Sequence, residues 1–218
     1  IDVNFGCPSN KVAGNHMCSA LLDYPKEIKK ILSYLVDSLG KPVTAKIRLG
    51  YKKKNYLEVV KQGYDSGASA ICLHARTAVN GYKTAADWKA IRQVKKKFSF
   101  PIIGNGDIVD GMSAQLLLKD IDFVMVGRAA IGDPFIFDRI NRYLKNGEIV
   151  EKPSLEEKYS CFLEYVKLSR RYDLYDFSRI KRMSLAFAKY IPRSSHLREA
   201  LNNCKTIENI QSEFERFI

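Results

Sequence analysis

The stretch IIGNGDIVDGMSAQLLLKDIDFVMVGR, residues 102–128, decides the fold. Its two apolar runs, Ile102–Asn105 and Phe123–Val126, have the length and composition of buried β-strands. Between them, Met112–Lys119 has the pattern of a helix. A helix that joins two short apolar strands is typical of a βα unit, so the two strands are predicted to run parallel in one sheet.

The same alternation continues back to the first residues of the chain. Further strands are predicted at Ile1–Phe5, Val43–Arg48 and Ala70–His74, and further helices at Pro25–Leu39, Tyr56–Ser66 and Trp88–Phe98. Repeated βα units predict an α/β protein with a parallel sheet, either a TIM barrel or a doubly wound sheet. Both architectures bind ligands at the carboxyl ends of their strands.

No strand pattern follows Pro134. A polar joint at residues 147–154 leads instead into helical patterns at Leu155–Tyr172, Phe177–Tyr190, Ser195–Asn203 and Thr206–Phe217. We therefore expect a small helical bundle after the α/β part of the chain.

The composition is that of an ordinary soluble globular protein. The 218 residues are 46% hydrophobic and 28% charged, which excludes a largely disordered chain, a collagen-like repeat and a coiled-coil rod. No apolar run reaches the roughly 18–20 residues of a membrane-spanning helix. The five cysteines are an odd number and form no Cys-x-x-Cys pair, so we expect a reducing, cytoplasmic location.

The formal net charge of +12 indicates an anionic partner, most often a nucleic acid. The charge is concentrated between Lys158 and Lys205, where eleven basic residues stand against four acidic ones. Five tyrosines lie in the same region, and basic groups among aromatic rings suit phosphates and unpaired bases. The pattern is equally compatible with tyrosines in helix cores and charges that merely face solvent.

Polar residues directly follow the last two predicted strands of the α/β part. Gly127-Arg128 offers backbone N–H groups and a guanidinium, which together suit a phosphate group. Asn105-Gly106-Asp107 follows the neighbouring strand and predicts a turn that a ligand can approach closely. The alternative is a purely structural turn in which Arg128 pairs with Asp107 or Asp133.

Lys46, His74 and Cys7 also lie at strand ends. A lysine in a barrel mouth is costly unless it meets an electron-rich ligand atom or pairs with a carboxylate, and Lys46 allows both. His74 would point into the same mouth, but a lone histidine is most often a satisfied polar residue. Cys7 is a candidate nucleophile, metal ligand or general acid. A zinc set with His16 and Cys18 matches no usual ligand spacing, so we predict no metal site.

Five motifs stand in the order and spacing of a known family. They are DVNFGCPSNKV with SALL (residues 2–12 and 19–22), KIRLG (46–50), LHART with Tyr82 and ADW (73–88), IIGNGDI (102–108) and VMVGRAAIGDPFIF (124–137). The tail adds RIKR (179–182) and LNNCKTIENIQSEFERF (201–217). Together they resemble the tRNA-dihydrouridine synthases, most closely the common bacterial branch. The resemblance covers essentially all 218 residues.

The resemblance implies a (β/α)8 TIM barrel followed by a C-terminal α-helical bundle. It places an FMN-binding barrel portion at residues 1–146 and a helical tRNA-binding domain at residues 147–218. The implied reaction is the reduction of specific uridines in tRNA to 5,6-dihydrouridine, with NADPH as reductant. Reduced FMN would give a hydride to C6 of the uracil ring, and a cysteine, by motif position Cys7, would protonate C5. The target base must be flipped out to reach the flavin.

The resemblance also assigns roles to individual residues. Positions that resemble cofactor contacts are Lys46, His74, Asn105, Gly106, Asp107, Gly127 and Arg128. Asn4 and Arg48 resemble positions near the target base, and Arg179 and Arg182 resemble basic positions that face tRNA. We expect a monomer with tRNA as its partner, and neither a membrane nor a metal as a partner.

The sequence departs from the family pattern at three places. Cys18 stands where a glycine commonly precedes Ser-Ala-Leu-Leu, and residues 83–85 replace a segment that usually carries a glycine. In the family, the Gly-Cys-Pro motif follows the fourth of eight strands, so this chain is expected to hold strands 4–8 and to lack the first three βα units. Two other functions remain open. One is a non-catalytic tRNA-binding remnant, and the other is an FMN barrel of the dihydroorotate dehydrogenase type. The basic tail and the Gly-Cys-Pro context argue against the second.

Overall fold

The core of the α/β part is a five-stranded parallel sheet in which neighbours in sequence are neighbours in space. The computed structural model describes residues 1–218, except for the side chain of Asn10. The strands are β1 (Asp2–Asn4), β2 (Thr44–Arg48), β3 (Ala70–His74), β4 (Ile102–Asn105) and β5 (Phe123–Met125). Each predicted strand is confirmed to within two residues at either end.

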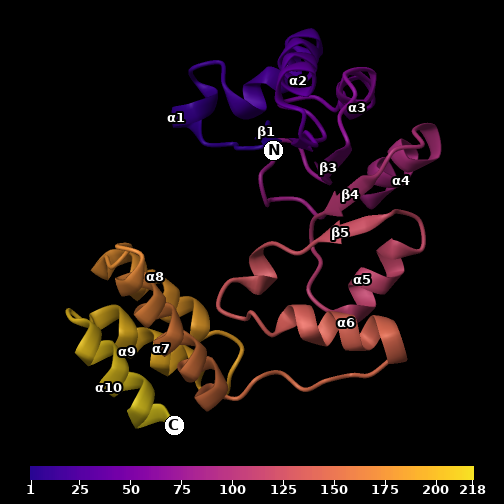
Figure 1. The fold of residues 1–218 in the computed structure, drawn as a ribbon. Helices are drawn as coiled ribbons and strands as arrows, with labels where there is room; N and C mark the ends of the chain where they lie inside the picture. Colours follow the sequence, from indigo (N-terminus) through magenta and orange to yellow (C-terminus); the bar gives the residue numbers. More distant parts are fainter. The chain divides into compact units, whose positions relative to one another are not determined.

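The helices between these strands are α1 (Asn10–Ala13), η1 (Cys18–Asp23), α2 (Pro25–Leu39), α3 (Tyr56–Asp65), α4 (Trp88–Lys97) and α5 (Gly111–Leu118). Of these, α2, α3, α4 and α5 lie together on one side of the sheet (Figure 1). Local chemistry explains several of their ends. Pro25 occupies the first turn of α2, and Gly40 ends it in the left-handed conformation. The Asp87 and Asp110 side chains cap α4 and α5.

Alternation along the strands separates an apolar layer from a polar face. Ala45, Ile47, Ile71 and Leu73 are buried on the side of the helices. A methyl group on Gly63 of α3 would lie 2.8 Å from Ile71, so this helix packs directly on β3. The residues between these apolar positions face the other way, because successive strand side chains point to opposite faces. The opposite face carries Lys46, Arg48, Cys72 and His74.

The sheet has two open edges within the described residues, because β1 pairs only with β2 and β5 pairs only with β4. Parallel strands with helices between them are consistent with part of a barrel.

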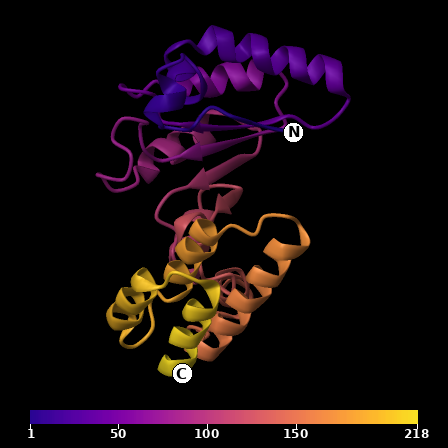
Figure 2. The same ribbon diagram turned by 90° about the vertical axis from the view of Figure 1, so that its left-hand side faces the viewer.

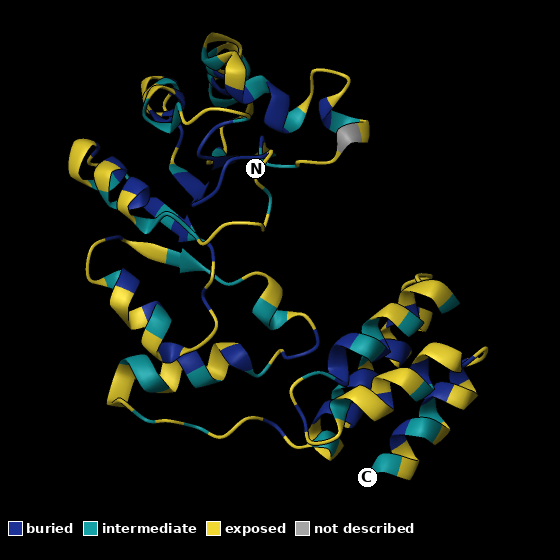
Figure 3. Cartoon of the chain, turned by 180° about the vertical axis from the view of Figure 1, so that it is seen from behind, coloured by how far each residue is buried: buried dark blue, intermediate teal, exposed yellow. Residues whose placement is uncertain are grey.

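The chain divides into two compact units, residues 1–127 and residues 128–218. The second unit contains η2 (Arg128–Ala130), α6 (Ile136–Asn146), α7 (Leu155–Arg171), α8 (Phe177–Phe187), α9 (Ser194–Asn203) and α10 (Ile207–Phe217). Helices α7–α10 share one hydrophobic core (Figure 2; Figure 3). Phe162 is fully buried at its centre and stacks on Phe214, with ring centroids 5.3 Å apart. Among the described residues, no helix has both the length and the apolar character that a membrane span requires.

Two features differ from the sequence prediction. The helix predicted over Phe177–Tyr190 ends at Phe187, because Tyr190 takes a left-handed backbone and Pro192 disfavours helix at the residue before it. Helix α6 was not predicted at all, and neither were the short α1 and η1. Helix α6 contains Ile136 and Ile140 at helical spacing, but no helix was predicted between Pro134 and the polar joint at residues 147–154.

Replacement of Phe162 by alanine tests the shared core of α7–α10. We expect Phe162→Ala to lower the free energy of unfolding by about 3–5 kcal/mol, because the substitution leaves a cavity at a fully packed site. Phe137→Ala is the matched control, since Phe137 lies on α6 and is 51% exposed. Urea denaturation of both variants gives the comparison. Equal losses in the two variants would contradict the packing described.

Cys18 offers a second stability test, because its φ of 49° lies in the left-handed region that favours glycine. Cys18→Gly relieves roughly 1–2 kcal/mol of backbone strain and costs somewhat less in unfolded-chain entropy. We expect the thermal midpoint to rise, by the equivalent of about 0.5–1 kcal/mol. The neighbouring Met17→Gly, at a φ of −112°, is expected to lower it. A fall in both variants would refute the strain argument.

Candidate functional site

The sheet register brings the predicted site residues of neighbouring strands side by side. Asn4 on β1 lies beside Lys46 on β2. Arg48, at the end of β2, lies beside His74 at the end of β3, and His74 lies beside Asn105 at the end of β4. All are at or near the carboxyl ends of their strands, which is where parallel α/β sheets bind ligands.

The turn that carries Cys7 is held from two sides. The Gly6 N–H donates to Asn4 Oδ1 at 2.9 Å, and Arg48 Nε donates to the Gly6 carbonyl oxygen at 2.7 Å. Both polar groups of Gly6 are therefore fixed immediately before the thiol. Cys7 itself is half-buried, and its sulfur is free of any disulfide. A thiol at a braced turn can donate a proton to a ligand held at the strand ends.

Arg48 is a buried cation without a carboxylate partner among the described residues. It is 4% exposed, it donates to the carbonyl oxygens of Gly6 and Thr77, the second at 3.3 Å, and it also has a side-chain hydrogen bond with Tyr82. Burial lowers the pKa of Arg48, the nearby Arg76 acts in the same direction, and Tyr82 opposes both. A buried guanidinium of this kind favours an electron-rich or anionic ligand atom nearby.

Lys46 and Asn105 form a chain of polar contacts across the sheet. Lys46 Nζ lies 3.4 Å from Asn105 Oδ1, a long hydrogen bond, and Asn105 Nδ2 donates to the Met125 carbonyl oxygen at 2.8 Å. Lys46 is half-buried and has no ion pair with a carboxylate among the residues described. Its ammonium group has three donors, so most of its hydrogen-bonding capacity is available to a ligand.

A second buried arginine, Arg76, was not among the predicted site residues. Its Nη2 donates to both carboxylate oxygens of Asp107, at 2.8 and 2.6 Å, and its Nε donates to the Thr84 carbonyl oxygen at 2.6 Å. The buried Nη1 has no hydrogen-bond partner in the described part of the chain. The pair ties the end of β3 to the turn after β4, and Ala86 N–H adds a third bond to Asp107.

The turn at Gly106 and Asp107 depends on its backbone conformation. Gly106 has a φ of 132° and Asp107 a φ of 53°, both in the region that favours glycine. A methyl group on Gly106 would lie 3.0 Å from Ala86 Cβ and 3.4 Å from the His74 ring. Trp88 Nε1 also donates to the Gly106 carbonyl oxygen at 3.1 Å. The turn is therefore packed closely over His74, which is buried.

Tyr82 joins the two arginines and the histidine. The guanidinium carbons of Arg48 and Arg76 lie 5.9 and 5.7 Å from the centre of its ring, and the His74 ring lies 5.9 Å away. Both guanidinium distances are within the range of cation–π attraction. Tyr82 is exposed, and residues 83–85 follow it directly in the sequence.

The remaining predicted residues lie in or next to the second unit. Gly127 ends the first unit, and Arg128 begins η2 in the second. Asp133 forms a two-bond pair with Arg139, at 2.6 and 3.1 Å. Arg179 and Arg182 lie three residues apart on α8, so they share a helix face, and both are exposed.

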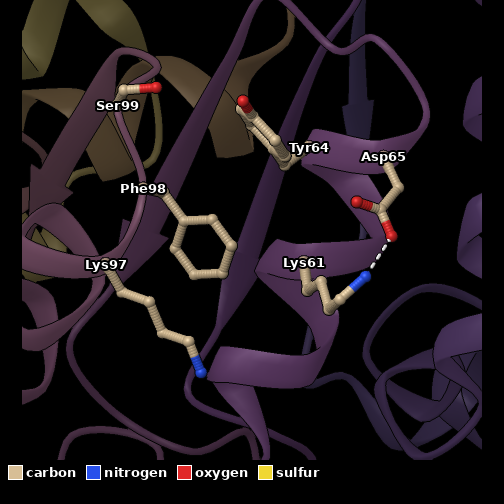
Figure 4. Close-up of a pocket in the computed structure, with 6 residues that line it drawn as sticks. All are labelled: Lys61, Tyr64, Asp65, Lys97, Phe98 and Ser99. Atoms are coloured by element: carbon tan, nitrogen blue, oxygen red, sulfur yellow. Dashed lines mark hydrogen bonds and ion pairs between the residues drawn. The ribbon is translucent and has the colours of Figure 1, made fainter.

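A groove elsewhere in the first unit is separate from this cluster (Figure 4). It measures about 280 Å³ and lies between the final turns of α3 and α4. Its lining is Lys61, Tyr64, Asp65, Lys97, Phe98 and Ser99. Lys61 is already paired with Asp65 at 2.5 Å. These residues precede β3 and β4, so the groove lies at the amino ends of the strands, opposite to the polar cluster.

The described residues contain no group of three or more His, Cys, Asp or Glu side chains that could hold a metal ion.

Comparison with known proteins gives a consistent result over the whole chain. The family model described as dihydrouridine synthase (Dus) matches residues 1–217. The chain is 38% identical over 208 residues to a protein of Vibrio vulnificus named tRNA-dihydrouridine synthase B. This match covers 93% of this chain and 65% of the Vibrio protein. Proteins of the same name from Pectobacterium carotovorum and Escherichia coli are 40% and 39% identical, and each match covers 81% of this chain and 55% of the relative.

The chain thus spans between about half and two thirds of the length of the curated relatives it matches. The match of the family model over nearly every residue is the decisive finding. Because the family model matches residues 1–217, the chain belongs to the dihydrouridine synthase family.

Proposed function

We propose that this chain carries the flavin- and uridine-facing residues of a tRNA-dihydrouridine synthase. The reaction is the FMN-dependent reduction of specific uridines in tRNA to 5,6-dihydrouridine, with NADPH as the reductant. The observation that carries the proposal is the braced Cys7 turn beside Arg48, on a strand-end face that also bears Lys46. The names of the similar proteins support the same activity.

The residues present fit a flavin mononucleotide. Lys46 and Arg48 are cations without carboxylate partners among the described residues, and a reduced flavin ring is electron-rich. A methyl group on Gly127 would meet nothing nearer than Asn105 Nδ2 at 3.8 Å, so a phosphate group can approach this backbone. Lys46, His74 and residues 105–107 would hold the ring and its side chain, and Gly127-Arg128 the phosphate.

Bound FMN supplies the hydride that reduces C6 of the uracil ring. Negative charge then develops on C5 and on the neighbouring carbonyl oxygen O4, and the Cys7 thiol gives its proton to C5. Asn4 and Arg48 keep the thiol in place by fixing both polar groups of Gly6. The buried charge of Arg48 stabilises the electron-rich base, and water returns a proton to Cys7 after release.

The fold proposed for the complete site is the (β/α)8 barrel, with β1–β5 as its strands 4–8. The open edges of β1 and β5 support this, because unpaired strand edges are a liability that barrel closure removes. Residues 147–218 would form the helical tRNA-binding domain, in which Arg179 and Arg182 face the phosphate backbone.

One preparation separates this function from a non-catalytic tRNA-binding remnant. Purified protein that has flavin absorbance and forms dihydrouridine in tRNA supports the enzyme. Colourless protein that still binds tRNA, with an affinity that falls steeply with salt, supports the remnant. The open sheet edges are the observation that favours the non-catalytic tRNA-binding remnant as a second candidate function.

Replacement of Cys7 tests the proton donor. We expect Cys7→Ala to reduce dihydrouridine formation by about 10²–10⁴-fold, because a positioned general acid contributes that much. FMN binding should remain, since the thiol is not proposed as a cofactor contact. Cys161→Ala is the control, because this half-buried cysteine lies on α7 in the other unit. Unchanged turnover in Cys7→Ala would rule out its role as the acid.

Replacement of the two α8 arginines tests the RNA contact. Arg179→Ala and Arg182→Ala should each weaken tRNA binding, and each should reduce the slope of log affinity against log salt by about 1. Arg216→Ala is the control, because Arg216 is already paired with Glu213 on α10. Filter binding of tRNA at several salt concentrations measures the slopes. Slopes that match the unsubstituted protein would place tRNA elsewhere.

A further inference from the structure

Gly132 lies where the segment after Arg128 meets the last turn of α8. Its φ is 77°, and it is buried. A methyl group on Gly132 would lie 2.3 Å from the carbonyl carbon of Ala186, 2.4 Å from its oxygen and 2.6 Å from the Phe187 nitrogen. All three are backbone atoms of α8, which cannot move aside as a flexible side chain can. Glycine is therefore required here for both its conformation and its small size.

The residue that follows Gly132 is fixed as well. Asp133 is 8% exposed and is held by two hydrogen bonds from Arg139 of α6. Lys158 of α7 is 1% exposed, and its Nζ donates to the Lys189 carbonyl oxygen just past the end of α8, at 2.5 Å. Burial lowers the pKa of Lys158, and the carboxylate of Asp133 opposes that effect. The segment thus contacts α8 at Gly132 and α6 at Asp133, and the ammonium group of Lys158 on α7 interacts electrostatically with the Asp133 carboxylate.

A continuous series of turns connects this contact to Arg128. Ile131 N–H donates to the Arg128 carbonyl oxygen at 3.2 Å, Asp133 N–H donates to Ala130 at 3.2 Å, and Ile136 N–H donates to Asp133 at 3.3 Å. Because these three backbone hydrogen bonds connect the segment from Arg128 to Ile136, we expect a displacement at Gly132 to reach η2 rather than to be absorbed by a loose loop.

We propose that Gly132 is a positioning residue for the phosphate-binding turn. By allowing the segment to lie on the backbone of α8, it fixes the direction in which Arg128 presents its guanidinium to the phosphate group of a flavin mononucleotide. This inference rests on the proposed function, in which Gly127-Arg128 hold that phosphate.

The test compares two flavins that differ only in the phosphate group, FMN and riboflavin. Gly132→Ala should weaken FMN binding by about ten- to hundredfold, the value of one lost charge-assisted hydrogen bond, and leave riboflavin binding within about twofold. Gly147→Ala is the matched control. Gly147 has a φ of 71°, so it suffers the same backbone strain, but a methyl group there meets no atom within 4 Å. Quenching of flavin fluorescence gives both dissociation constants for the full chain.

Each outcome decides between the inference and the function on which it rests. If the unsubstituted chain binds FMN no better than riboflavin, the proposed phosphate site is wrong, and the positioning role of Gly132 is wrong with it. If it prefers FMN and Gly132→Ala keeps the full preference, or loses both flavins equally, the positioning role alone is overturned.

Lys158→Met provides a second variant should Gly132→Ala fail to fold. It keeps an apolar stem of similar length and removes the hydrogen bond to Lys189. A smaller loss, again confined to FMN, is expected. An unchanged preference for FMN in this variant would also overturn the positioning role.

Discussion

The parallel register of β2, β3 and β4 is the constraint on which the strand-end cluster depends. It sets Arg48 beside His74 and His74 beside Asn105. A slip of one residue in β2 would turn Lys46 and Arg48 into the layer packed by helices and would bring Ala45 and Ile47 to the polar face. Both charged groups would then lie in an apolar layer without the hydrogen bonds that Lys46 and Arg48 make in the observed register, which is far more costly than the loss of a single hydrogen bond. The apolar layer thus enforces the arrangement of the polar one.

Most of the fold could be predicted from the sequence because its strands are short apolar runs and its helices have clear ends. Pro25 and Gly40 mark the two ends of α2, and the prediction over that helix agrees with the structure. The exceptions depend on context. Helix α6 lies in a stretch for which only the end of the strand pattern was predicted, and α8 ends early because of the left-handed Tyr190 and the proline two residues later.

Some residues of the candidate site could likewise be predicted from the sequence, and others could not. Lys46, His74 and Asn105 could be singled out because each lies at or near the end of a predicted strand. Arg76 could not, because its partner Asp107 is distant in sequence, and only the pairing of β3 with β4 brings them together. The one sequence signal was a charged residue directly after an apolar strand. The roles given to Cys7, Arg179 and Arg182 came from family resemblance, whereas the phosphate role of Arg128 was already indicated by its position after a predicted strand. The structure supplies the surroundings of these residues rather than a test.

The close contact at Gly132 also determines how the chain can be divided for expression. A piece that begins at residue 147 would contain α7–α10 but would leave the last turn of α8 without the backbone that covers it, and Lys158 without the nearby carboxylate of Asp133. A piece that begins at Arg128 retains both, and it coincides with the compact unit of residues 128–218. The polar joint at residues 147–154 therefore lies inside the compact unit of residues 128–218, and a cut there would expose backbone of α8 that the intact unit covers.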